Sequence, residues 1–577
     1  MCGIVGYTGS GRARDIVLDG LKALEYRGYD SAGIALVGKT LQVRKCGGRV
    51  EALAAITPPS DCTTAIGHTR WATHGAPTAR NAHPHLSFDG KIAVVHNGVV
   101  ENHELLREEL IARGIPIVSE TDSELIAHLL ALESGTMTER ISKVARRAEG
   151  ALTFLAVREG DDRIYCHRRG AALIVAHSDI GSFASSDMLA LAPYAERVTV
   201  LQDGESAVLS PDGILLCAAD GKTPSAGKSC AVTATAPRNC DCHMREEIAE
   251  IPDALYATYS RFLSFARERK DVLTRMRLAR RILLTGCGTA YHACLYGKEI
   301  FEEYLGIPCT VLPASEAENP RFTDSDTFSV FVTQSGETAD TLKALAACKE
   351  LGAFTLAITN VAGSSATFAA DAHFLLNAGA EIAVAATKSY CCQLLALWLL
   401  AKAAADERVS AECIDDLCKK AAGLVKSTDF PKCRTADKLF FIGKGTDYIT
   451  ATEGALKFKE ITYKCAEAHT AGELKHGTIA LADENSAAVV CMTVPQDAKR
   501  IKATVSELKS RGTAVYAVSS VGDAGGDATL AIPVPDECAL LPVLAVIPMQ
   551  MLALDCAIAL GLDPDKPRNL AKSVTVI

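Results

Sequence analysis

The 577-residue sequence has no block or stripe of lysine and arginine, and its formal net charge is −9. Nucleic acid is therefore not expected as the main partner, because binding it requires a clustered basic surface. Residues 1–14 contain no apolar core of the kind found in secretory signal peptides. Although the chain has 21 cysteines, we expect a cytoplasmic protein with reduced thiols rather than a disulfide scaffold.

Uninterrupted apolar segments long enough to span a membrane are also missing. The longest apolar stretch, 539–562, contains Pro542, Pro548, Gln550 and Asp555, which predicts a buried helix and no membrane contact. With 48% hydrophobic residues, a chain of this length can build buried cores for roughly three to five domains.

Metal-binding motifs are scarce. The segment from Cys240 to His243 holds two cysteines and a histidine, but no second pair follows at the spacing of zinc ligands. We therefore expect no metal and no other cofactor.

Cys2 follows the initiator methionine directly. Removal of Met1 would place a thiol and a free α-amine on one residue. Because a thiol titrates near ~8.5 and an α-amine near ~7.7 to 8, the amine can take the thiol proton near neutral pH, directly or through one water. Taken alone, Cys2 is equally consistent with the start of a short apolar strand over 2–6.

Polar residues are dense in the part of the chain that follows. The segment 68–75 carries a guanidinium, an indole and two imidazoles, which is costly inside a core unless these groups serve a site. Arg70 can form paired hydrogen bonds with an α-carboxylate and Asp122 can hold an α-ammonium, as in an amino-acid pocket. Asn97 and Gly98 offer the donors of an oxyanion hole. The alternative for Asn97 and Gly98 is a hairpin turn after a strand over 92–95.

Residues 2 to about 225 resemble the N-terminal-nucleophile glutamine amidotransferases, and the segment 27–33 also matches that family. The resemblance implies an αββα domain that takes L-glutamine. It implies Cys2 as the nucleophile and Asn97 with Gly98 as the oxyanion hole. It also implies a glutamine-binding set: Arg70, Trp71, Thr73, His74 and Asp122.

A linker is predicted over 226–244, after an amidotransferase domain over 2–225. Residues 221–229 and 233–238 are small, polar and interrupted by proline, with no periodicity. From Met244 onward, apolar residues recur every three or four positions, which predicts a helix.

The rest of the chain contains an internal duplication. A buried strand that runs into a glycine-containing turn and a helix occurs at 280–289 and again at 438–446. Strand, helix and strand then follow in both copies, at 328–333, 338–351 and 354–359, and at 487–494, 498–511 and 514–519. This α/β alternation implies right-handed βαβ units in parallel sheets. We expect two doubly wound domains over 245–425 and 426–562, with a tail over 563–577.

Two turns of the first copy are suited to binding an anion. In parallel sheets ligands bind beyond the carboxyl ends of the strands, where helix N-termini direct N–H groups outward. The structural alternative is that Ser335 or Thr338 caps the following helix. Capping explains one hydroxyl, but the turn 333–338 contains three. Neither G-x-G-x-x-G nor G-x-x-x-x-G-K-[ST] occurs at these turns, so we predict a phosphate site rather than a nucleotide site. The two turns are Cys287-Gly288-Thr289 and Thr333-Gln334-Ser335-Gly336-Glu337-Thr338.

These turns resemble those of sugar isomerase domains, which bind phosphosugars. With the segments 377–384, 453–461, 472–477 and 567–576, nearly the whole chain resembles the glucosamine-6-phosphate synthase family. The resemblance implies glutamine-dependent amination and isomerisation of fructose 6-phosphate to glucosamine 6-phosphate with release of glutamate. It implies sugar-phosphate contacts from Cys287, Gly288, Thr289, Thr333, Gln334, Ser335, Thr338, Val384 and Ala571.

The resemblance also assigns the chemistry on the sugar. Lys572 forms a Schiff base with the ketone, Glu460 moves a proton between C1 and C2, and His476 opens the ring, with Lys457 in the same site. It implies a homodimer in which His476 enters the site of the neighbouring subunit. The alternatives are a surface ion pair of Lys457 with Glu460, and a solvated tail around Lys572.

Two other function classes are open on the residues alone. A non-catalytic phosphosugar sensor would need the strand-end hydroxyls but not Cys2, Arg70 and Asp122. An amidotransferase for phosphoribosyl pyrophosphate would need an acidic, Gly/Thr-rich loop, and the sequence has none. We therefore favour the synthase.

Overall fold

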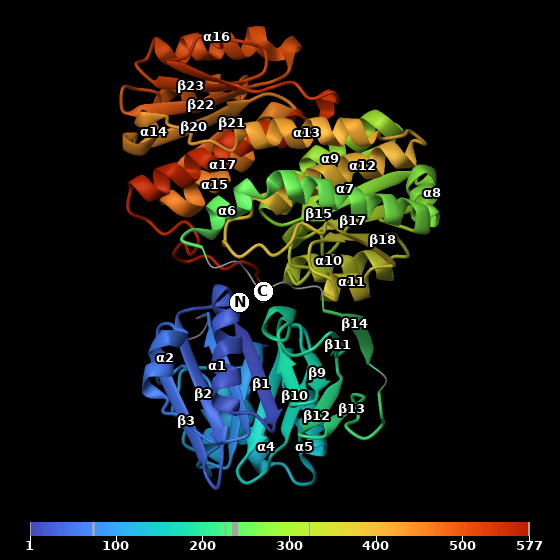
Figure 1. Ribbon diagram of the computed structural model, residues 1–577, viewed down its shortest axis with the longest axis vertical. Helices are drawn as coiled ribbons and strands as arrows, with labels where there is room; N and C mark the ends of the chain where they lie inside the picture. Colours follow the sequence, from blue (N-terminus) through green and yellow to red (C-terminus); the bar gives the residue numbers. More distant parts are fainter. Residues whose placement is uncertain (1, 72–74, 226, 233–239, 322, 575–577) are drawn as a thin grey trace. The chain divides into compact units, whose positions relative to one another are not determined.

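The computed structural model describes residues 2–71, 75–225, 227–232, 240–321 and 323–574. It divides into two compact units (Figure 1). The N-terminal unit comprises Met1–Pro237 with Ala571–Ile577, and the C-terminal unit comprises Arg238–Leu570. The finer domain boundaries at 225, 244, 425 and 562 stay predictions.

The N-terminal unit is built from fourteen strands among the described residues. These are β1 (Gly3–Gly9), β2 (Ser31–Val37), β3 (Leu41–Gly47), β4 (Thr64–Arg70), β5 (His85–Leu86), β6 (Ile92–Val100), β7 (Gly150–Arg158), β8 (Ile164–His167), β9 (Ile174–Ser178), β10 (Gly181–Ser185), β11 (Arg197–Val200), β12 (Ser206–Ser210), β13 (Gly213–Cys217) and β14 (Lys228–Ala231). The helices are α1 (Ala13–Ala23), α2 (Val50–Ile56), α3 (His103–Ala112), α4 (Ser123–Leu132) and α5 (Met137–Arg147).

Two antiparallel sheets form the centre of this unit. Their strand orders are β14-β11-β9-β10-β1-β4-β2-β3 and β13-β12-β8-β7-β6-β5. Ile4 and Ile66 point into the core between the sheets, whereas the next residues, Val5 and Gly67, face α1. Helices α4 and α5 pack on the second sheet. Because successive side chains of a strand point to opposite faces, β1 and β4 are buried on both sides. The predicted αββα layering is confirmed.

The C-terminal unit contains two parallel sheets. Its strands are β15 (Arg281–Gly286), β16 (Cys309–Pro313), β17 (Thr327–Val332), β18 (Phe354–Thr359), β19 (Ala372–Leu375), β20 (Lys438–Gly443), β21 (Ala466–Thr470), β22 (Ser486–Met492), β23 (Ala514–Ser519) and β24 (Ala528–Ala531). Its helices are α6 (His243–Ala249), α7 (Ile251–Glu268), α8 (Lys270–Leu278), α9 (Thr289–Leu305), α10 (Ala339–Glu350), α11 (Ser365–Ala369), α12 (Lys388–Ala404), α13 (Ala411–Leu424), α14 (Pro431–Thr435), α15 (Thr446–Thr462), α16 (Ala498–Lys509) and α17 (Leu541–Ala559).

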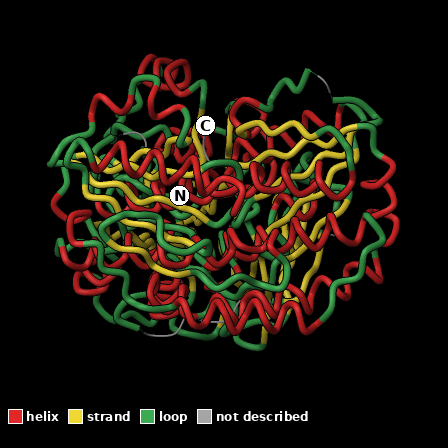
Figure 2. The backbone as a smooth tube through the Cα atoms, turned by 90° about the horizontal axis from the view of Figure 1, so that it is seen from above, coloured by secondary structure: helices red, strands yellow, loops and turns green. Residues whose placement is uncertain are grey.

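The two sheets have the same topology, which confirms the predicted duplication. Their strand orders are β16-β15-β17-β18-β19 and β21-β20-β22-β23-β24, and all pairs are parallel. Helices cover both faces: α10 lies on one side of the first sheet and α9 on the other, and α16 and α15 flank the second sheet in the same way (Figure 1). Figure 2 shows helices in red flanking strands in yellow. The fold class is therefore the predicted doubly wound one.

The long apolar stretch forms α17 in the core of this unit. By length and composition, Cys538–Ala559 is the one helical segment among the described residues that could cross a membrane, but 89% of its most apolar window is buried in the protein. It packs against α15 and α13, as a core helix does. The prediction of a buried helix is confirmed.

Candidate active sites

Cys2 lies directly before β1, next to the end of β4. The strands pair antiparallel with Gly3 opposite Thr69, which brings Cys2 to Arg70 and Trp71. The Cys2 Sγ accepts a hydrogen bond from the backbone N–H of Trp71 at 3.3 Å. The sheet register, set by the buried faces of β1 and β4, therefore positions the predicted nucleophile.

Asn97 and Gly98 both lie inside β6, which runs unbroken from Ile92 to Val100. The alternative prediction of a hairpin turn at these residues is wrong. Asn97 Nδ2 donates to the backbone oxygen of Cys2 at 3.1 Å. Gly98 has φ +147°, and a Cβ there would lie 2.1 Å from the carbonyl oxygen of Ala151. Only glycine fits this position, so the strand itself places the two predicted oxyanion donors beside each other.

His68, whose role was not predicted, holds the amide of Asn97. The Nε2 atom of His68 lies 3.1 Å from Asn97 Oδ1 and 3.0 Å from the carbonyl oxygen of His96. Both partners are acceptors, so we assign the proton to Nε2. Burial lowers the pKa of His68 to about 3, which keeps the ring neutral. This contact directs the Asn97 Nδ2 group toward Cys2.

The buried histidines make the N-terminal unit sensitive to acid. Burial lowers the pKa of His68 to about 3 and also lowers the pKa values of His83 and His96. Unfolded histidine titrates near ~6.5, so between that pH and the folded pKa the unfolded chain binds more protons than the folded one. Stability is therefore fully present above pH ~6.5 and is lost as the pH falls, for His68 by up to about 1.4 kcal/mol per pH unit down to its folded pKa of about 3.

Hydrogen exchange measures this loss. Protection of the amides in β4 and β6, corrected for intrinsic exchange rates, should fall between pH 7 and pH 5.5. Equal protection at both pH values would contradict the prediction.

The predicted glutamine clamps are buried near this site. Arg70 and Asp122 are 3% and 5% exposed. The Arg70 guanidinium donates to the carbonyl oxygens of Gly75 at 3.1 Å and Ala76 at 3.3 Å. Burial lowers the pKa of Arg70, and the nearby groups of Cys2 and Asp122 oppose this effect. Arg70, Cys2 and Asp122 thus interact electrostatically, as one pocket requires.

The remaining predicted glutamine contacts are partly visible. The Trp71 ring packs edge-on against Tyr29, with ring centroids 5.8 Å apart. Asp122 precedes α4 and accepts the backbone N–H of Val100 at 2.7 Å, which ties it to the end of β6. Thr73 and His74 lie outside the described residues.

The second candidate site lies along one face of α15. Glu453, Lys457 and Glu460 follow at spacings of four and three, so their side chains share that face. Lys457 Nζ lies 2.6 Å from Glu460 Oε2 and 3.5 Å from Glu453 Oε1. Because Lys457 is only 1% exposed, the alternative of a surface ion pair is wrong. Burial alone would lower the pKa of Lys457, but Glu460 and Glu453 raise it above its ordinary value.

Two residues of this site were missed by the sequence analysis. Glu453 is fully buried and contacts His292 Nδ1 at 2.7 Å. Thr289 joins this network, because its hydroxyl donates to Glu453 at 3.1 Å and accepts from Lys457 Nζ at 3.0 Å. The spacing of Glu453 from Lys457 was the available signal, whereas His292 comes from another helix. Thr289 thereby links α15 to the predicted 287–289 turn.

The turn 333–338 lies between β17 and α10, as predicted. The hydroxyls of Thr333 and Thr338 are 3.1 Å apart, and Ser335 Oγ accepts the Glu337 N–H at 3.1 Å. Thr338 makes no side-chain capping bond to α10, so the capping alternative is wrong for Thr338. Gly336, at φ +69°, has no space for a Cβ because Ser364 Oγ would be 2.0 Å away. Hydroxyls and a tightly folded backbone thus gather at the start of a helix.

The matching turn of the second domain is closed by a carboxylate. Gly288 and Gly445 have nearly the same backbone angles, φ 54° with ψ −122° and φ 58° with ψ −128°. The following turns differ, because Asp447 stands where the first domain has Ala290. Its carboxylate accepts the Thr493 N–H at 2.8 Å and the Thr493 hydroxyl at 2.5 Å. The Asp447 side chain therefore occupies the hydrogen-bond donors of Thr493 that a phosphate bound at this turn would need.

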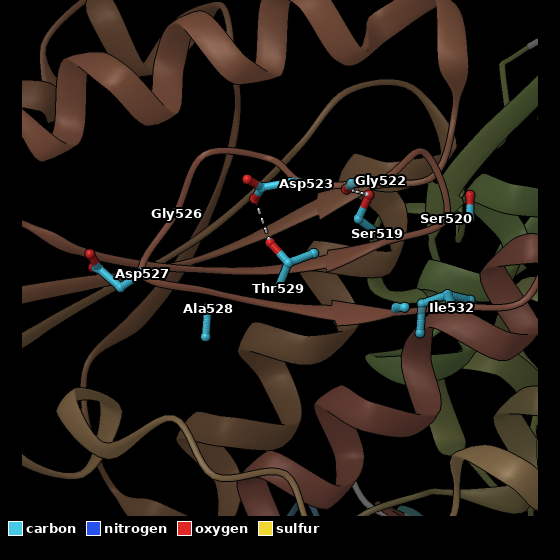
Figure 3. A pocket seen from close by; sticks show the side chains of 10 residues that line it. Ser519, Ser520, Gly522, Asp523, Gly526, Asp527, Ala528, Thr529 and Ile532 are labelled. Carbon is cyan, nitrogen blue, oxygen red and sulfur yellow. Dashed lines mark hydrogen bonds between the residues drawn. The ribbon is translucent and has the colours of Figure 1, made fainter.

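A pocket of about 590 Å³ at the end of β23 does not suit a phosphate either (Figure 3). Its wall carries the carboxylates of Asp523 and Asp527, and its lining residues include no lysine or arginine. Asp523 accepts from the Thr529 hydroxyl at 3.1 Å. Like charges repel, so the 333–338 turn is the better candidate.

The remaining predicted sugar-site residues come from segments other than α15. His476 is exposed after a short 3-10 turn, and strand β21 separates it from α15, which the sequence analysis had not anticipated. Among the described residues, no hydrogen bond or ion pair joins His476 to Lys457 or Glu460. The Val384 N–H donates to the Asp565 carbonyl oxygen at 3.0 Å. Ala571 and Lys572 belong to the N-terminal unit.

Comparisons with protein families match both halves of the chain. A family model described as a SIS domain matches residues 275–403 and again 432–560, and one described as a glutamine amidotransferase domain matches residues 68–192. The chain is 40% identical over 602 residues to the glutamine–fructose-6-phosphate aminotransferase (isomerizing) of Aquifex aeolicus, and 40% identical over 609 residues to the protein of that name from Symbiobacterium thermophilum. Both alignments cover 100% of each chain.

Solved structures resemble the C-terminal part. The C-terminal domain of glucosamine-fructose-6-phosphate aminotransferase from Francisella tularensis is 29% identical, with a TM-score of 0.51 over 57% of this chain and 99% of that one. Tagatose-6-phosphate ketose/aldose isomerase from Escherichia coli has a TM-score of 0.52 at 18% identity, over 57% of this chain and 96% of that one. The second likeness shows the fold alone.

Proposed function

The chain belongs to the glutamine–fructose-6-phosphate aminotransferase (isomerizing) family, and we propose that the residues of the two candidate sites perform its two half-reactions. The enzyme uses glutamine to aminate fructose 6-phosphate and forms glucosamine 6-phosphate. The observation that carries the residue assignment is the burial of Lys457 between Glu460 and Glu453. A surface helix would not hold such a cluster, because buried charges are costly without a partner or a function.

In the proposed first half-reaction, Cys2 Sγ attacks the side-chain carbonyl carbon of glutamine. The α-amine of Cys2 takes the thiol proton and returns a proton to the leaving ammonia. Asn97 Nδ2 and the Gly98 N–H stabilise the oxyanion, and His68 keeps the Asn97 amide in position. Arg70 binds the α-carboxylate and Asp122 the α-ammonium, with Trp71, Thr73 and His74 as further glutamine contacts. Water then hydrolyses the thioester and releases glutamate.

In the proposed second half-reaction, the 333–338 turn and the 287–289 turn hold the phosphosugar, with Val384 and Ala571 as further contacts. His476 helps open the ring, and Lys572 forms a Schiff base with C2 of the ketose. Formation of this Schiff base releases the carbonyl oxygen as water. Ammonia then displaces Lys572 from C2. Glu460 then moves a proton from C1 to C2, and the adjacent Lys457 stabilises the charge that develops.

An isotope experiment tests the proposed function. The protein is incubated with fructose 6-phosphate and glutamine that carries ¹⁵N in its side-chain amide. We expect glucosamine 6-phosphate containing ¹⁵N, in step with the glutamate released. A non-catalytic phosphosugar sensor would bind fructose 6-phosphate and leave both substrates unchanged, which would contradict the proposal.

We also propose a homodimer with a shared sugar site and a cytoplasmic location. The exposure of His476, and the lack of a described contact with Lys457 or Glu460 in its own chain, support its entry into the partner's site. All 21 cysteines are free thiols, which suits a reducing compartment.

Mixed dimers test the shared site. A Lys572→Ala chain co-expressed with a His476→Ala chain should regain part of the synthase activity that each variant lacks alone, because one of the two sites then combines intact residues. The readout is glucosamine 6-phosphate formation by heterodimers purified through two different tags. If verified heterodimers remain inactive, His476 acts within its own chain.

A further inference from the structure

The chain between α17 and Lys572 is attached to the C-terminal unit at two places. The first is Asp565, whose carboxylate accepts the backbone N–H groups of His243 at 2.8 Å and Met244 at 2.7 Å. These are the first residues of α6, where N–H groups lack helical partners. A carboxylate at a helix N-terminus also interacts favourably with the helix dipole. Asp565 therefore caps the helix that follows the linker.

Asp565 also makes a contact through its backbone. Its carbonyl oxygen accepts the N–H of Val384 at 3.0 Å, and Val384 is a proposed sugar-phosphate contact. One residue thus joins the start of α6, the 384 loop and the C-terminal tail. The last residue of the Cys240–His243 segment supplies one of the capped N–H groups.

The second attachment is Tyr463, the residue after the end of α15. The Tyr463 hydroxyl accepts the backbone N–H of Arg568 at 2.8 Å, and the Arg568 guanidinium lies 4.3 Å from the ring centroid, within range of a cation–π interaction. Tyr463 has φ +60°, a left-handed conformation that strains a residue with a bulky side chain. A tyrosine occupies a position where glycine would be unstrained, and its ring and hydroxyl both contact Arg568.

We propose that Asp565 and Tyr463 are positioning residues that clamp the tail and set the location of Lys572. The inference rests on the proposed Schiff-base role of Lys572. Four residues of extended chain span at most about 14 Å, so holding Arg568 limits how far Lys572 can move. Tyr463 directly follows the end of α15, the helix that carries Glu460, the proposed proton-transfer residue.

Two variants and one matched control test the clamp. Asp565→Asn leaves one carbonyl oxygen for two N–H groups. Tyr463→Gly removes the ring and hydroxyl while relieving the left-handed backbone, so a loss of activity cannot be assigned to backbone strain. The control is Asp371→Asn. Asp371 directly precedes β19 and likewise accepts a backbone N–H, that of Thr355 in β18, at 3.0 Å, but it is not part of the clamp.

The readout is the rate at which borohydride traps fructose 6-phosphate on Lys572, followed by peptide mass spectrometry. We expect Asp565→Asn and Tyr463→Gly to slow trapping and synthase kcat by about fivefold to tenfold, the size of one or two lost hydrogen bonds. The KM for fructose 6-phosphate should stay within about twofold, and glutamine hydrolysis should not change. Asp371→Asn should trap like the wild type.

The outcomes separate the clamp from the proposed function. Wild-type protein that is labelled at a residue other than Lys572 would reject the Schiff-base role and the clamp with it. Wild-type labelling at Lys572 with equally fast labelling in both variants would reject the clamp alone. Equal slowing in Asp371→Asn would show a general loss of structure, which also rejects a positioning role.

Discussion

We expect Cys2→Ala to abolish glutamine hydrolysis and glutamine-dependent formation of glucosamine 6-phosphate, while fructose 6-phosphate should still bind. Removing a nucleophile costs about 10⁴-fold or more in rate, because the remaining groups can bind and polarise the substrate but cannot form the thioester. The sugar-phosphate turns lie in the other compact unit, so their affinity should not change. Glutamate release and binding calorimetry with fructose 6-phosphate measure the two effects.

The matched control for this variant is Cys62→Ala. Cys62 is a half-buried free thiol of the same unit and should be dispensable for catalysis. Intact-mass measurement completes the test, because the free α-amine requires removal of Met1. Fully active enzyme that retains Met1 would contradict the role of the amine as the base.

We expect Lys572→Ala to lower the amination of fructose 6-phosphate by about 10³-fold or more, because the proposed Schiff base could not form and the ketone would not be activated. Glutamine hydrolysis continues at least in part, since Cys2, Asn97 and Asp122 are untouched. Lys572→Arg is the informative companion variant. It keeps the positive charge but has no amine nucleophile, so it should be as inactive as Lys572→Ala in synthase assays.

Borohydride trapping locates the reacting lysine directly. With wild-type protein, the reduced sugar should be found on the peptide that contains Lys572. Sugar attached to Lys457 instead would assign the Schiff base to that residue. Substantial synthase activity in Lys572→Arg would mean that charge alone is sufficient.

The doubly wound fold of the C-terminal half followed from local patterns in the sequence, whereas the αββα fold of the N-terminal domain followed from the family resemblance. Ile282, Leu283 and Leu284 form a continuous apolar run, which predicts a strand buried on both faces. In the structure Ile282 and Leu284 enter one core and Leu283 enters another. The paired strand, glycine and helix segments at 280–289 and 438–446 likewise predicted two domains of one topology, because each copy encodes its own βαβ units.

Other features were decided only by tertiary structure. A hairpin and a continuous strand were both compatible with Asn97 and Gly98, and the pairing of β6 with β7 selected the strand. A surface pair and a buried cluster were equally compatible with Lys457 and Glu460. Contacts from Thr289 and His292, more than 150 residues away, accompany the burial of the cluster.

The difference between the features that could be predicted from the sequence and those that could not has a physical cause. Periodicity and turn residues act over a few positions and can be read along the chain, so the sequence by itself determined the secondary structure, the duplication and the residue types of both sites. Contacts such as that of Asp565 with His243, 322 residues apart, depend on how segments far apart in the sequence pack in the folded chain. The roles of His68 and Glu453, the clamp on the tail and the closed turn at Asp447 were therefore visible only once the chain was folded.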